Sequence, residues 1–353
     1  MTDTTQPQSG DRRVGGRPRR VTMSDVARKA GVSAAAVSYA LSGAPGVSEE
    51  RRQRILVIAD EMGFRPSRIA RELRSGTTKA IGLLLADIAN PFYTEVAGGV
   101  IAAAAEEGYE VFVSHVGVDG SRQSDVALAQ VDRNCSGLIF TSLVADDKPL
   151  LDKLRHENIP VVQLYRKIED EPSDWVGIDD YSASFEMASH AVATGRRNVA
   201  ILGGPGTSSV SANRMSGYRD ALAKAGVQAI NDPDLWGELT RASGAQRARA
   251  LFAEHPETDA IVCGNDLIAL GVLDVCREIG KRVPEDVALT GFDDMTFSSA
   301  GPLQLSTVTV PRDLMGQRAA RMILQRIAGD ESPPRSELLP YGIQVRDTTA
   351  RRE

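Results

Sequence analysis

From residue 79 onward, short apolar runs alternate with segments of helical pattern, and this alternation restricts the possible folds more than any other feature. Apolar runs lie at 80–86, 109–116, 137–141 and 160–164, and a second set lies at 199–203, 260–263 and 287–291. Helical patterns separate them, as at 92–107, 121–133 and 148–156. Strands that are apolar throughout are covered on both faces, which is typical of a parallel sheet. Two such sets in series predict an α/β body of two similar lobes, each a doubly wound sheet.

Several polar and aromatic side chains follow the predicted strands, where a doubly wound sheet binds its ligands. Arg214 can hold a hydroxyl pair or a carboxylate with its planar guanidinium, and Asn265 carries a donor and an acceptor together. For Asn265 and Asp293, helix capping is the alternative role. A set of Asp, Asn and Arg suits a polyol or sugar. The candidate ligand-binding residues are Asp87, Asn90, Phe92, Tyr165, Arg214, Asn265 and Asp293.

The run VTMSDVARKAGVSAAAVSYAL at 21–41 predicts two short helices joined by a tight turn. Thr22 can cap the first helix and form a capping box with Asp25. Gly31 permits a left-handed turn, and Ser33 can cap the second helix. A helix-turn-helix motif places its second helix in the DNA major groove. The sequence therefore indicates DNA binding.

Charge is distributed unevenly along the chain. Residues 1–78 carry 14 Arg and Lys against 8 Asp and Glu, a net charge of +6, and the remainder carries 27 against 39, a net charge of −12. A basic head on an acidic body indicates that only the head meets a polyanion. Within the head, the polar tail at 1–20 is expected to be disordered, and a third helix opened by Ser48 completes the DNA-binding unit.

Composition excludes several classes of protein. The three cysteines, Cys135, Cys263 and Cys276, lack CxxC spacing, so we expect buried thiols and neither a disulfide framework nor a zinc site. No nucleophile–base constellation, P-loop or metal motif occurs, so neither an enzyme nor a cofactor is expected. The N-terminus lacks a signal-peptide pattern and no run of 18 apolar residues exists, so we expect a protein of the reducing cytoplasm rather than a membrane protein.

Seven segments occur in the order and spacing of one known family. They are VTMSDVARKAGVS (21–33), IARELRSG (69–76), NPFY (90–93), NRMSGY (213–218), GNDLIALG (264–271), VPEDVALTGFDD (283–294) and LSTVTVP (305–311). Each segment alone is a weak signal, but seven in one order and structural context are specific. Through them the chain resembles, over about residues 21–350, the lactose/galactose-repressor (LacI/GalR) family of bacterial transcription regulators.

The resemblance implies homodimers that bind near-palindromic operators and a small-molecule effector that binds between two lobes. The expected parts are a basic tail at 1–20, a helix-turn-helix headpiece at 21–66, a hinge helix at 67–78 and a body at 79–351 that resembles periplasmic sugar-binding proteins. Three crossovers, near Ile178, Val310 and Pro334, would divide the body into its lobes. The N-lobe would comprise 79–178 plus 310–332, and the C-lobe 179–309 plus 333–351.

By the same resemblance, the second helix of the headpiece reads bases. Tyr39 stands where the family commonly has Arg, which suits bidentate contact with guanine. Ala34 and Ala35 offer methyl contacts, best with thymine, although these alanines would also simply favour helix formation. The candidate DNA-binding residues of the headpiece are Thr22, Ser33, Ala34, Ala35, Ser38 and Tyr39.

The hinge and the tail add further candidate DNA contacts. Leu73 occupies the position from which the family's hinge helix inserts a leucine between central base pairs, and packing beneath the body is the alternative. The tail segment GGRPRR at 15–20 resembles the core of an AT-hook, an extended arm in the minor groove, and the alternative is nonspecific attraction to phosphate. The candidates are Ser67, Arg68, Ala70, Arg71, Leu73, Arg74, Arg17 and Arg19.

The chain departs from the family beside its fourth predicted strand. Family members often carry Asp there, where this chain has Tyr165 followed by Arg166. A sugar remains the leading expectation for the effector. Two other functions compete: the same kind of regulator controlled by a protein co-repressor, and a solute-binding protein that shares the fold of the body.

Overall fold

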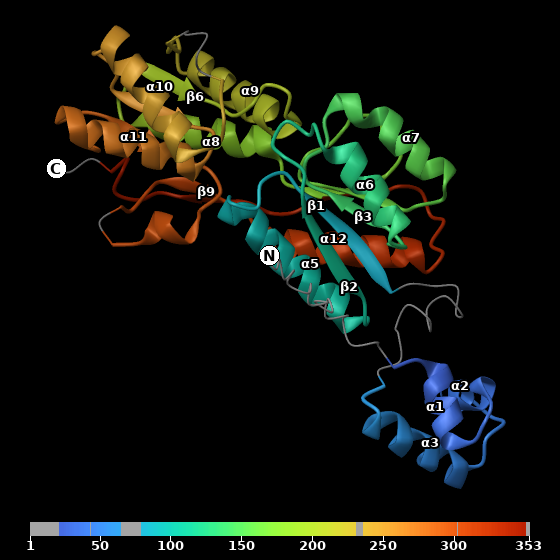
Figure 1. Cartoon of the computed structure of the whole chain (residues 1–353). Coiled ribbons are helices and arrows are strands. Elements are labelled where there is room, and N and C mark those ends of the chain that lie inside the picture. The colour runs from blue at the N-terminus through green and yellow to red at the C-terminus, as the bar shows by residue number, and fades with distance from the viewer. Residues whose placement is uncertain (1–20, 43, 65–78, 231–235, 302, 351–353) are drawn as a thin grey trace, which may run out of the picture. The chain divides into compact units, whose positions relative to one another are not determined.

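The computed structural model describes residues 21–42, 44–64, 79–230, 236–301 and 303–350 (Figure 1). The chain divides into two compact units, Met1–Thr78 and Lys79–Glu353. No helix in the described ranges combines the length and the apolar character needed to cross a membrane. The expected tail and hinge lie outside the described residues, and with them the candidate DNA contacts Arg17, Arg19, Ser67, Arg68, Ala70, Arg71, Leu73 and Arg74.

The described part of the first unit is a headpiece formed by α1 (Met23–Ala30), α2 (Ala34–Ser42) and α3 (Glu49–Glu61). Thr22 caps α1: its side-chain oxygen accepts the backbone N–H of Asp25, and Asp25 Oδ2 accepts the backbone N–H of Thr22 at 3.0 Å. Gly31 ends α1 in the left-handed region, with φ of 66°. The predicted capping box and left-handed turn are therefore confirmed.

Each helix contributes apolar side chains to the core of the headpiece. Val26 of α1, Val37 of α2 and Ile55 of α3 are buried in one cluster. Leu41 and Phe64 pack against it from the margin. Full burial of side chains of this size contributes about 1.5–3 kcal/mol each, so the headpiece has a core of its own.

The first lobe of the second unit contains a six-stranded parallel sheet in the order β10-β5-β4-β3-β1-β2. Its strands are β1 (Ala80–Leu85), β2 (Glu110–His115), β3 (Leu138–Phe140), β4 (Val161–Leu164), β5 (Asp174–Gly177) and β10 (Ser336–Leu338). One face shares a core with helices α5 (Pro91–Glu106) and α12 (Arg312–Ile327). The other face shares a core with α6 (Gln123–Asp132) and α7 (Lys148–His156).

The second lobe has a parallel sheet in the order β6-β7-β8. Its strands are β6 (Val199–Leu202), β7 (Ala260–Cys263) and β8 (Ala288–Thr290). Helices α8 (Asp180–Ala193) and α9 (Ser209–Lys224) share a core with one face, and α10 (Arg241–Glu254) and α11 (Asp266–Ile279) with the other. An antiparallel pair, β9 (Thr307–Thr309) and β11 (Gly342–Gln344), completes the unit. The predicted α/β body with two parallel-sheet lobes is therefore confirmed.

The third crossover between the lobes lies later in the chain than expected. β10 pairs in parallel with β5, with Ser336 opposite Trp175, so β10 belongs to the sheet of the first lobe. The chain enters the second lobe only after β10, and the boundary expected near Pro334 was wrong. The segment Ser-Glu-Leu carries no apolar run that would identify a strand. It becomes the edge strand of the sheet through backbone pairing with β5.

β2 corrects the expectation that every apolar strand is covered on both faces. Among the described strands it pairs only with β1 and forms the outer edge of the sheet. Phe112 is 46% exposed and Val113 is 37% exposed. An apolar run does not distinguish a central strand from an edge strand, and proteins usually cover an apolar edge with another element or chain.

Glycines allow the helices that flank each sheet to approach closely. A Cβ on Gly99 of α5 would lie 2.1 Å from the carbonyl oxygen of Asp313 in α12. A Cβ on Gly217 of α9 would lie 2.3 Å from the carbonyl oxygen of Tyr181 in α8. Only a residue without a side chain fits such contacts. These glycines therefore allow α5 to pack closely on α12, and α9 on α8.

Candidate DNA interface and ligand cleft

α2 presents small and aromatic side chains at the surface of the headpiece. Ser33 caps the helix, because its Oγ accepts the backbone N–H of Ala36 at 3.2 Å. Ala34 and Ala35 are exposed, and Tyr39, one turn further along, is 46% exposed. These side chains are accessible to a partner such as the edge of a base pair.

The backbone around Tyr39 is held by α3. Arg52 Nη1 donates to the carbonyl oxygen of Tyr39 at 3.4 Å, and Arg52 Nη2 donates to that of Ala44 at 2.9 Å. The Tyr39 ring lies beside Gly46, where an added Cβ would be 3.3 Å from it. Ser38 is partly buried. Arg52 therefore ties the end of α2 to α3 and positions Tyr39.

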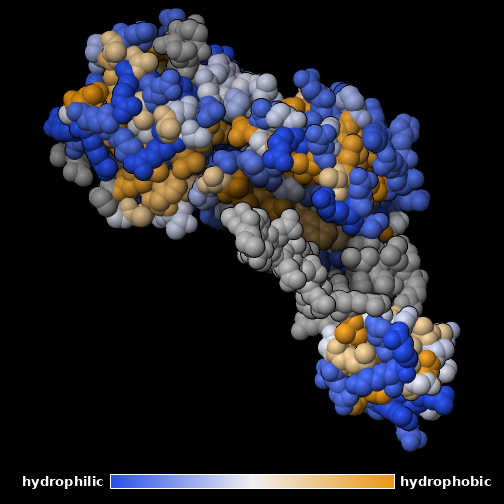
Figure 2. All heavy atoms as spheres, viewed as in Figure 1, coloured by the Kyte–Doolittle hydropathy of each residue, from blue (hydrophilic) through white to orange (hydrophobic). Residues whose placement is uncertain are grey.

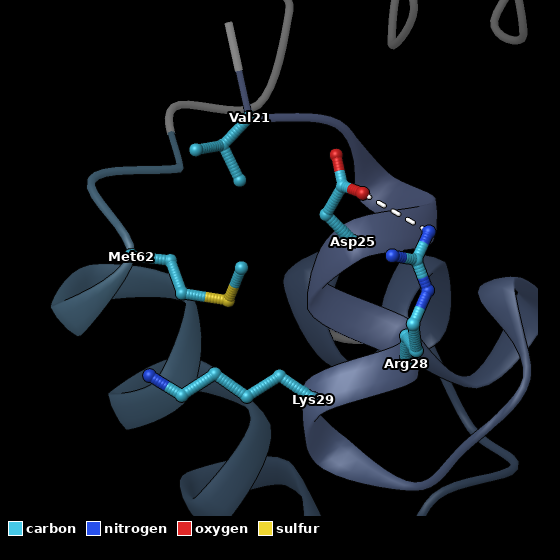
Figure 3. A pocket seen from close by; sticks show the side chains of 5 residues that line it. All are labelled: Val21, Asp25, Arg28, Lys29 and Met62. Atoms are coloured by element: carbon cyan, nitrogen blue, oxygen red, sulfur yellow. Dashed lines mark hydrogen bonds and ion pairs between the residues drawn. The ribbon is translucent and has the colours of Figure 1, made fainter. Parts of the chain in front are cut away.

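An open hollow lies on the headpiece between the start of α1 and the end of α3 (Figure 3). Asp25 Oδ1 accepts from Arg28 Nη2 at 3.2 Å, and Lys29 Nζ lies 3.6 Å from Glu61 Oε2 on α3. Val21 and Met62 supply its apolar wall. Its charged groups pair within the headpiece, so we assign this hollow a role in stabilising α1 and no ligand.

Six of the seven candidate ligand-binding residues meet around one cavity between the two lobes of the second unit. Asp87 does not line this cavity; its Oδ1 accepts the backbone N–H of Ala89 at 2.9 Å and stabilises the turn after β1. The other six candidates come from both lobes and lie near the carboxyl ends of the strands. The lining residues are Asn90, Phe92, Tyr93, Tyr165, Arg166, Ser208, Val210, Arg214, Leu239, Asn265 and Asp293.

Arg214, on α9, forms the centre of the cleft. Its Nε donates to Asp180 Oδ1 at 2.8 Å, and its Nη1 donates to the carbonyl oxygen of Gly264 at 2.5 Å. Its Nη2 contacts the Tyr165 hydroxyl and lies 3.4 Å from Asp293 Oδ1. The arginine side chain is only 4% exposed, so these charges interact in a medium of low dielectric constant.

The two carboxyl groups beside Arg214 have altered proton affinities. Burial raises the pKa of Asp293 to about 7, although the Arg214 and Arg312 guanidinium groups oppose the rise. Burial also raises the pKa of Asp180, again against the opposing charge of Arg214. The pKa of Asp293 is therefore far above the ordinary aspartate pKa of about 3.9.

Aromatic rings form the wall of the cleft on the first lobe. Tyr165 has φ of 70°, and its ring stacks on Phe92 with the centroids 4.8 Å apart. Phe92 meets Tyr93 edge to face at 5.2 Å. Trp175 Nε1 donates to the carbonyl oxygen of Tyr165 at 3.1 Å and supports its left-handed backbone. A stacked wall of this kind suits the apolar face of a ring-shaped ligand.

Asn90 and Asn265 cap helices at the margin of the cavity. Asn90 Oδ1 accepts the backbone N–H of Phe92 at 3.0 Å at the start of α5. Asn265 Oδ1 accepts that of Ile268 at 2.9 Å at the start of α11, and its Nδ2 donates to the carbonyl oxygen of Leu239 at 3.2 Å. The capping alternative weighed for Asn265 is thus present, and its side chain is engaged in this arrangement of the cleft.

The cavity that these residues enclose has a volume of about 20 Å³. A single water molecule needs about 10–15 Å³ of such space, whereas pockets for small molecules typically measure about 300–1,000 Å³. The cleft is therefore closed, and a ligand of the size of a sugar requires the lobes to part or the lining side chains to move.

The sequence-based candidates did not include Asp180, which pairs with Arg214. They also did not include five residues that line the cavity: Tyr93, Arg166, Ser208, Val210 and Leu239. Tyr93 lies in the quoted NPFY segment, and Arg166 directly follows Tyr165, so position relative to a strand was a usable signal for both. Asp180 follows β5, a strand without a long apolar run, so no sequence signal identified its place. Within the described residues, no group of three or more His, Cys, Asp and Glu side chains is placed to hold a metal ion.

Comparison with known families matches both units. The family model described as "Bacterial regulatory proteins, lacI family" matches residues 22–67. The model described as "Periplasmic binding proteins and sugar binding domain of LacI family" matches residues 78–346. The HTH-type transcriptional regulator CelR of Thermobifida fusca is 32% identical to this chain over 339 residues, which are 94% of this chain and 99% of CelR.

Two solved structures are similar to this chain over most of their length. A CelR–cellobiose complex is 30% identical, with a TM-score of 0.70, and the match covers 93% of this chain and 100% of that one. A Lac repressor dimer bound to operator and the anti-inducer ONPF is 26% identical, with a TM-score of 0.81, and the match covers 94% of this chain and 99% of that one.

Proposed function

The chain belongs to the LacI family of bacterial transcription regulators, and from that premise we propose that it represses transcription by binding a near-palindromic operator as a homodimer. A small polar metabolite, with a sugar as the leading candidate, binds between the lobes and changes the affinity of the headpieces for DNA. Neither a cofactor nor a catalytic step belongs to this function. The protein acts in the bacterial cytoplasm, at operators in the nucleoid.

The observation that carries the proposal is the position of Arg214 across the two lobes. Its Nη2 contacts the Tyr165 hydroxyl of the first lobe, while its Nε and Nη1 bind Asp180 and the Gly264 carbonyl group of the second. A ligand with hydroxyl groups can replace these contacts and change the separation of the lobes. A ligand shifts such an equilibrium only by the difference in its affinity for the two arrangements, and the Arg214 contacts supply that difference.

Apolar side chains exposed on the first lobe support homodimer formation. Phe112 and Val113 lie on the outer edge strand β2, and Ile101 of α5 is 46% exposed. Hydrophobic residues also gather on the surface next to β9 in the second lobe (Figure 2). Pairing about a two-fold axis would cover the open edge of the sheet and supply two headpieces for two operator half-sites.

Base reading by α2 relies on methyl and aromatic contacts in this proposal. Ala34 and Ala35 can contact the methyl group of thymine, and Tyr39 offers one hydroxyl group in place of the arginine fork. Thr22, Ser33 and Ser38 would then bind phosphate groups, which position the protein without reading sequence. Selectivity rests more heavily on the Leu73 wedge and on the arginines of the tail and the hinge.

Selection of operators from random duplex DNA by the full chain tests this reading. We expect a near-palindromic consensus that two chains bind together, with thymine favoured opposite Ala34 and Ala35. Strong enrichment of guanine at several positions facing α2 would contradict it. Leu73→Ala is expected to preserve the fold and to weaken operator bending, and an unchanged bend angle and affinity would remove the wedge role.

Control by a protein co-repressor is the second candidate, and the small closed cavity favours it. In that case no small molecule would stabilise the body, and a captured protein would raise operator affinity in a purified assay. A solute-binding function is disfavoured by the three helices of the headpiece, which such a protein does not need. The relative solved in complex with cellobiose favours a small-molecule effector.

A further inference from the structure

Arg166 differs from Arg214 in having no carboxylate partner at ion-pair distance among the described residues. Arg166 is 2% exposed, and its Nη1 donates to the carbonyl oxygens of Val118 and Ser142, each at 3.4 Å. Both carboxylates of the cleft, Asp180 and Asp293, lie beside Arg214 instead. A buried guanidinium group without an opposite charge is costly, so an anion bound next to Arg166 would gain a strong attraction.

Asp147 interacts electrostatically with Arg166 but does not form an ion pair with it. Its carboxylate accepts the backbone N–H of Val144 at 2.9 Å and a hydrogen bond from Gln123 at the start of α6, so it is engaged by other groups. Burial raises the pKa of Asp147, and the Arg166 guanidinium group opposes this rise only weakly. On the side of the cavity, Arg166 hydrogen-bonds the Tyr93 side chain, whose pKa is raised by burial, so this neighbour carries no negative charge at neutral pH. Arg214, which lines the same cavity, is itself a cation.

Three long helices begin at the same cavity. Asn90, Ser208 and Asn265 are the N-cap residues of α5, α9 and α11, and all three line the cavity. The N-terminus of a helix carries a partial positive charge and favours anions. The three helix termini therefore add to the field of Arg166, and this is a second observation that points to the same kind of ligand.

We propose that the ligand of this cleft is a hydroxylated anion, a sugar-like compound carrying a carboxylate or phosphate group, and that Arg166 pairs with its charged group. The proposal rests on the proposed function, since it names the class of effector. The hydroxyl groups of the ligand face Arg214 and Asp293, and its ring lies against Tyr165 and Phe92. The cleft must open for such a ligand to enter, because a cavity of about 20 Å³ is too small for its ring or its charged group.

Thermal unfolding of the full chain tests the proposal with matched pairs of compounds. The anionic probes are D-gluconate, D-glucuronate, D-galacturonate and D-glucose 6-phosphate, and the neutral probes are D-glucose and D-galactose. Inorganic phosphate is compared with chloride at equal ionic strength. We expect a saturable rise in Tm, about 5 °C at a hundredfold excess over Kd, with anionic probes only. The probes that act distinguish a carboxylate from a phosphate ligand.

Arg166→Gln is the decisive variant. It should weaken binding of the anionic probes by about 10- to 100-fold, as expected for the loss of hydrogen bonds to a charged group. It should leave Tm without ligand unchanged or higher, because it removes an unpaired buried charge. Arg166→Lys should retain part of the affinity. Arg249→Gln, which removes an exposed arginine paired with Glu278, is the matched control and should bind like the wild type.

Three results would overturn the assignment: no saturable response to any anionic probe, equal responses of wild type and Arg166→Gln, or equal affinity for the neutral parent sugars. A neutral sugar that binds both proteins alike and alters operator affinity would leave the regulator function intact. An anion that binds through Arg166 but leaves operator affinity unchanged would support the assignment and count against the function.

Discussion

Replacing Arg214 by methionine should separate the electrostatic role of this residue from its packing. The substitution retains an apolar chain that can lie on Phe292, whose ring centroid is 3.5 Å from Arg214 Cζ. It removes the ion pairs with Asp180 and Asp293 and the hydrogen bond to the Gly264 carbonyl group. Two buried carboxylates then remain without their main counter-charge.

The expected loss of stability is large. Removing one partner of a buried ion pair costs about 3–5 kcal/mol, because the remaining charge is left uncompensated. For a unit of this size, 1 kcal/mol corresponds to a change in Tm of about 2–4 °C. We therefore expect Arg214→Met to lower the Tm of the body by about 10 °C near pH 8.

The loss should depend on pH in a defined direction. Arg214 lowers the pKa of both Asp180 and Asp293, so without it both values rise further. A carboxyl group whose pKa is higher in the folded than in the unfolded chain stabilises the fold at low pH, and this contribution is lost as pH rises through the folded pKa. The deficit of the variant should be smaller near pH 5.5 than near pH 8, because the carboxyl groups can then hold protons.

Differential scanning calorimetry of the full chain at these two pH values measures the effect. Arg249→Met is the control, since its side chain is 54% exposed and its ion pair with Glu278 lies at the surface. Such pairs are worth about 0–1 kcal/mol, so its Tm should change little. An unchanged Tm in Arg214→Met, or an equal fall at both pH values, would refute the reasoning.

Variants elsewhere test the packing of both units. Gly99→Ala should destabilise the body because its Cβ would lie 2.1 Å from the Asp313 carbonyl oxygen. The Cβ of Gly98→Ala meets nothing within 4 Å, so this variant should raise the free energy of unfolding by about 0.5–1 kcal/mol through helix propensity. Equal effects of the two variants in calorimetry would contradict this. Thr22→Ala removes the cap of α1 and should lower the free energy of unfolding of the headpiece by about 1 kcal/mol, measured by urea unfolding. An unchanged urea midpoint would argue against the capping box. Burial raises the pKa of Cys263, so Ellman's reagent near pH 8 should modify the native chain slowly and the denatured chain rapidly; rapid modification of the native chain would show an accessible thiol.

Local signals in the sequence were sufficient for much of the fold. The apolar runs predicted β1, β3 and β4, because central strands of a parallel sheet are apolar along their whole length. Thr22 and Gly31 marked the ends of α1, because a cap and a left-handed turn depend on residues close in sequence. These features involve no partner from a distant part of the chain.

The features that were missed depend on distant partners. β10 becomes a strand by pairing with β5, about 160 residues away in the chain, and its own residues carry no apolar signal. Asp180 enters the cleft because α8 and α9 pack together, which brings it to Arg214. The edge position of β2 likewise depends on distant segments, as does the absence of a carboxylate at ion-pair distance from Arg166 among the described residues.

Operator affinity measured with and without a cleft ligand tests the central claim most directly. Fluorescence anisotropy would follow a selected operator duplex bound by the full chain, with the anionic compound that raises Tm most. Coupling between two sites is typically about 1–3 kcal/mol, or about 5- to 150-fold in affinity. We predict a change of about 10-fold or more in the Kd for operator of the wild type, and a smaller change in Arg166→Gln at the same ligand concentration because the variant binds the ligand more weakly. An operator Kd that is the same with and without saturating ligand would contradict the account.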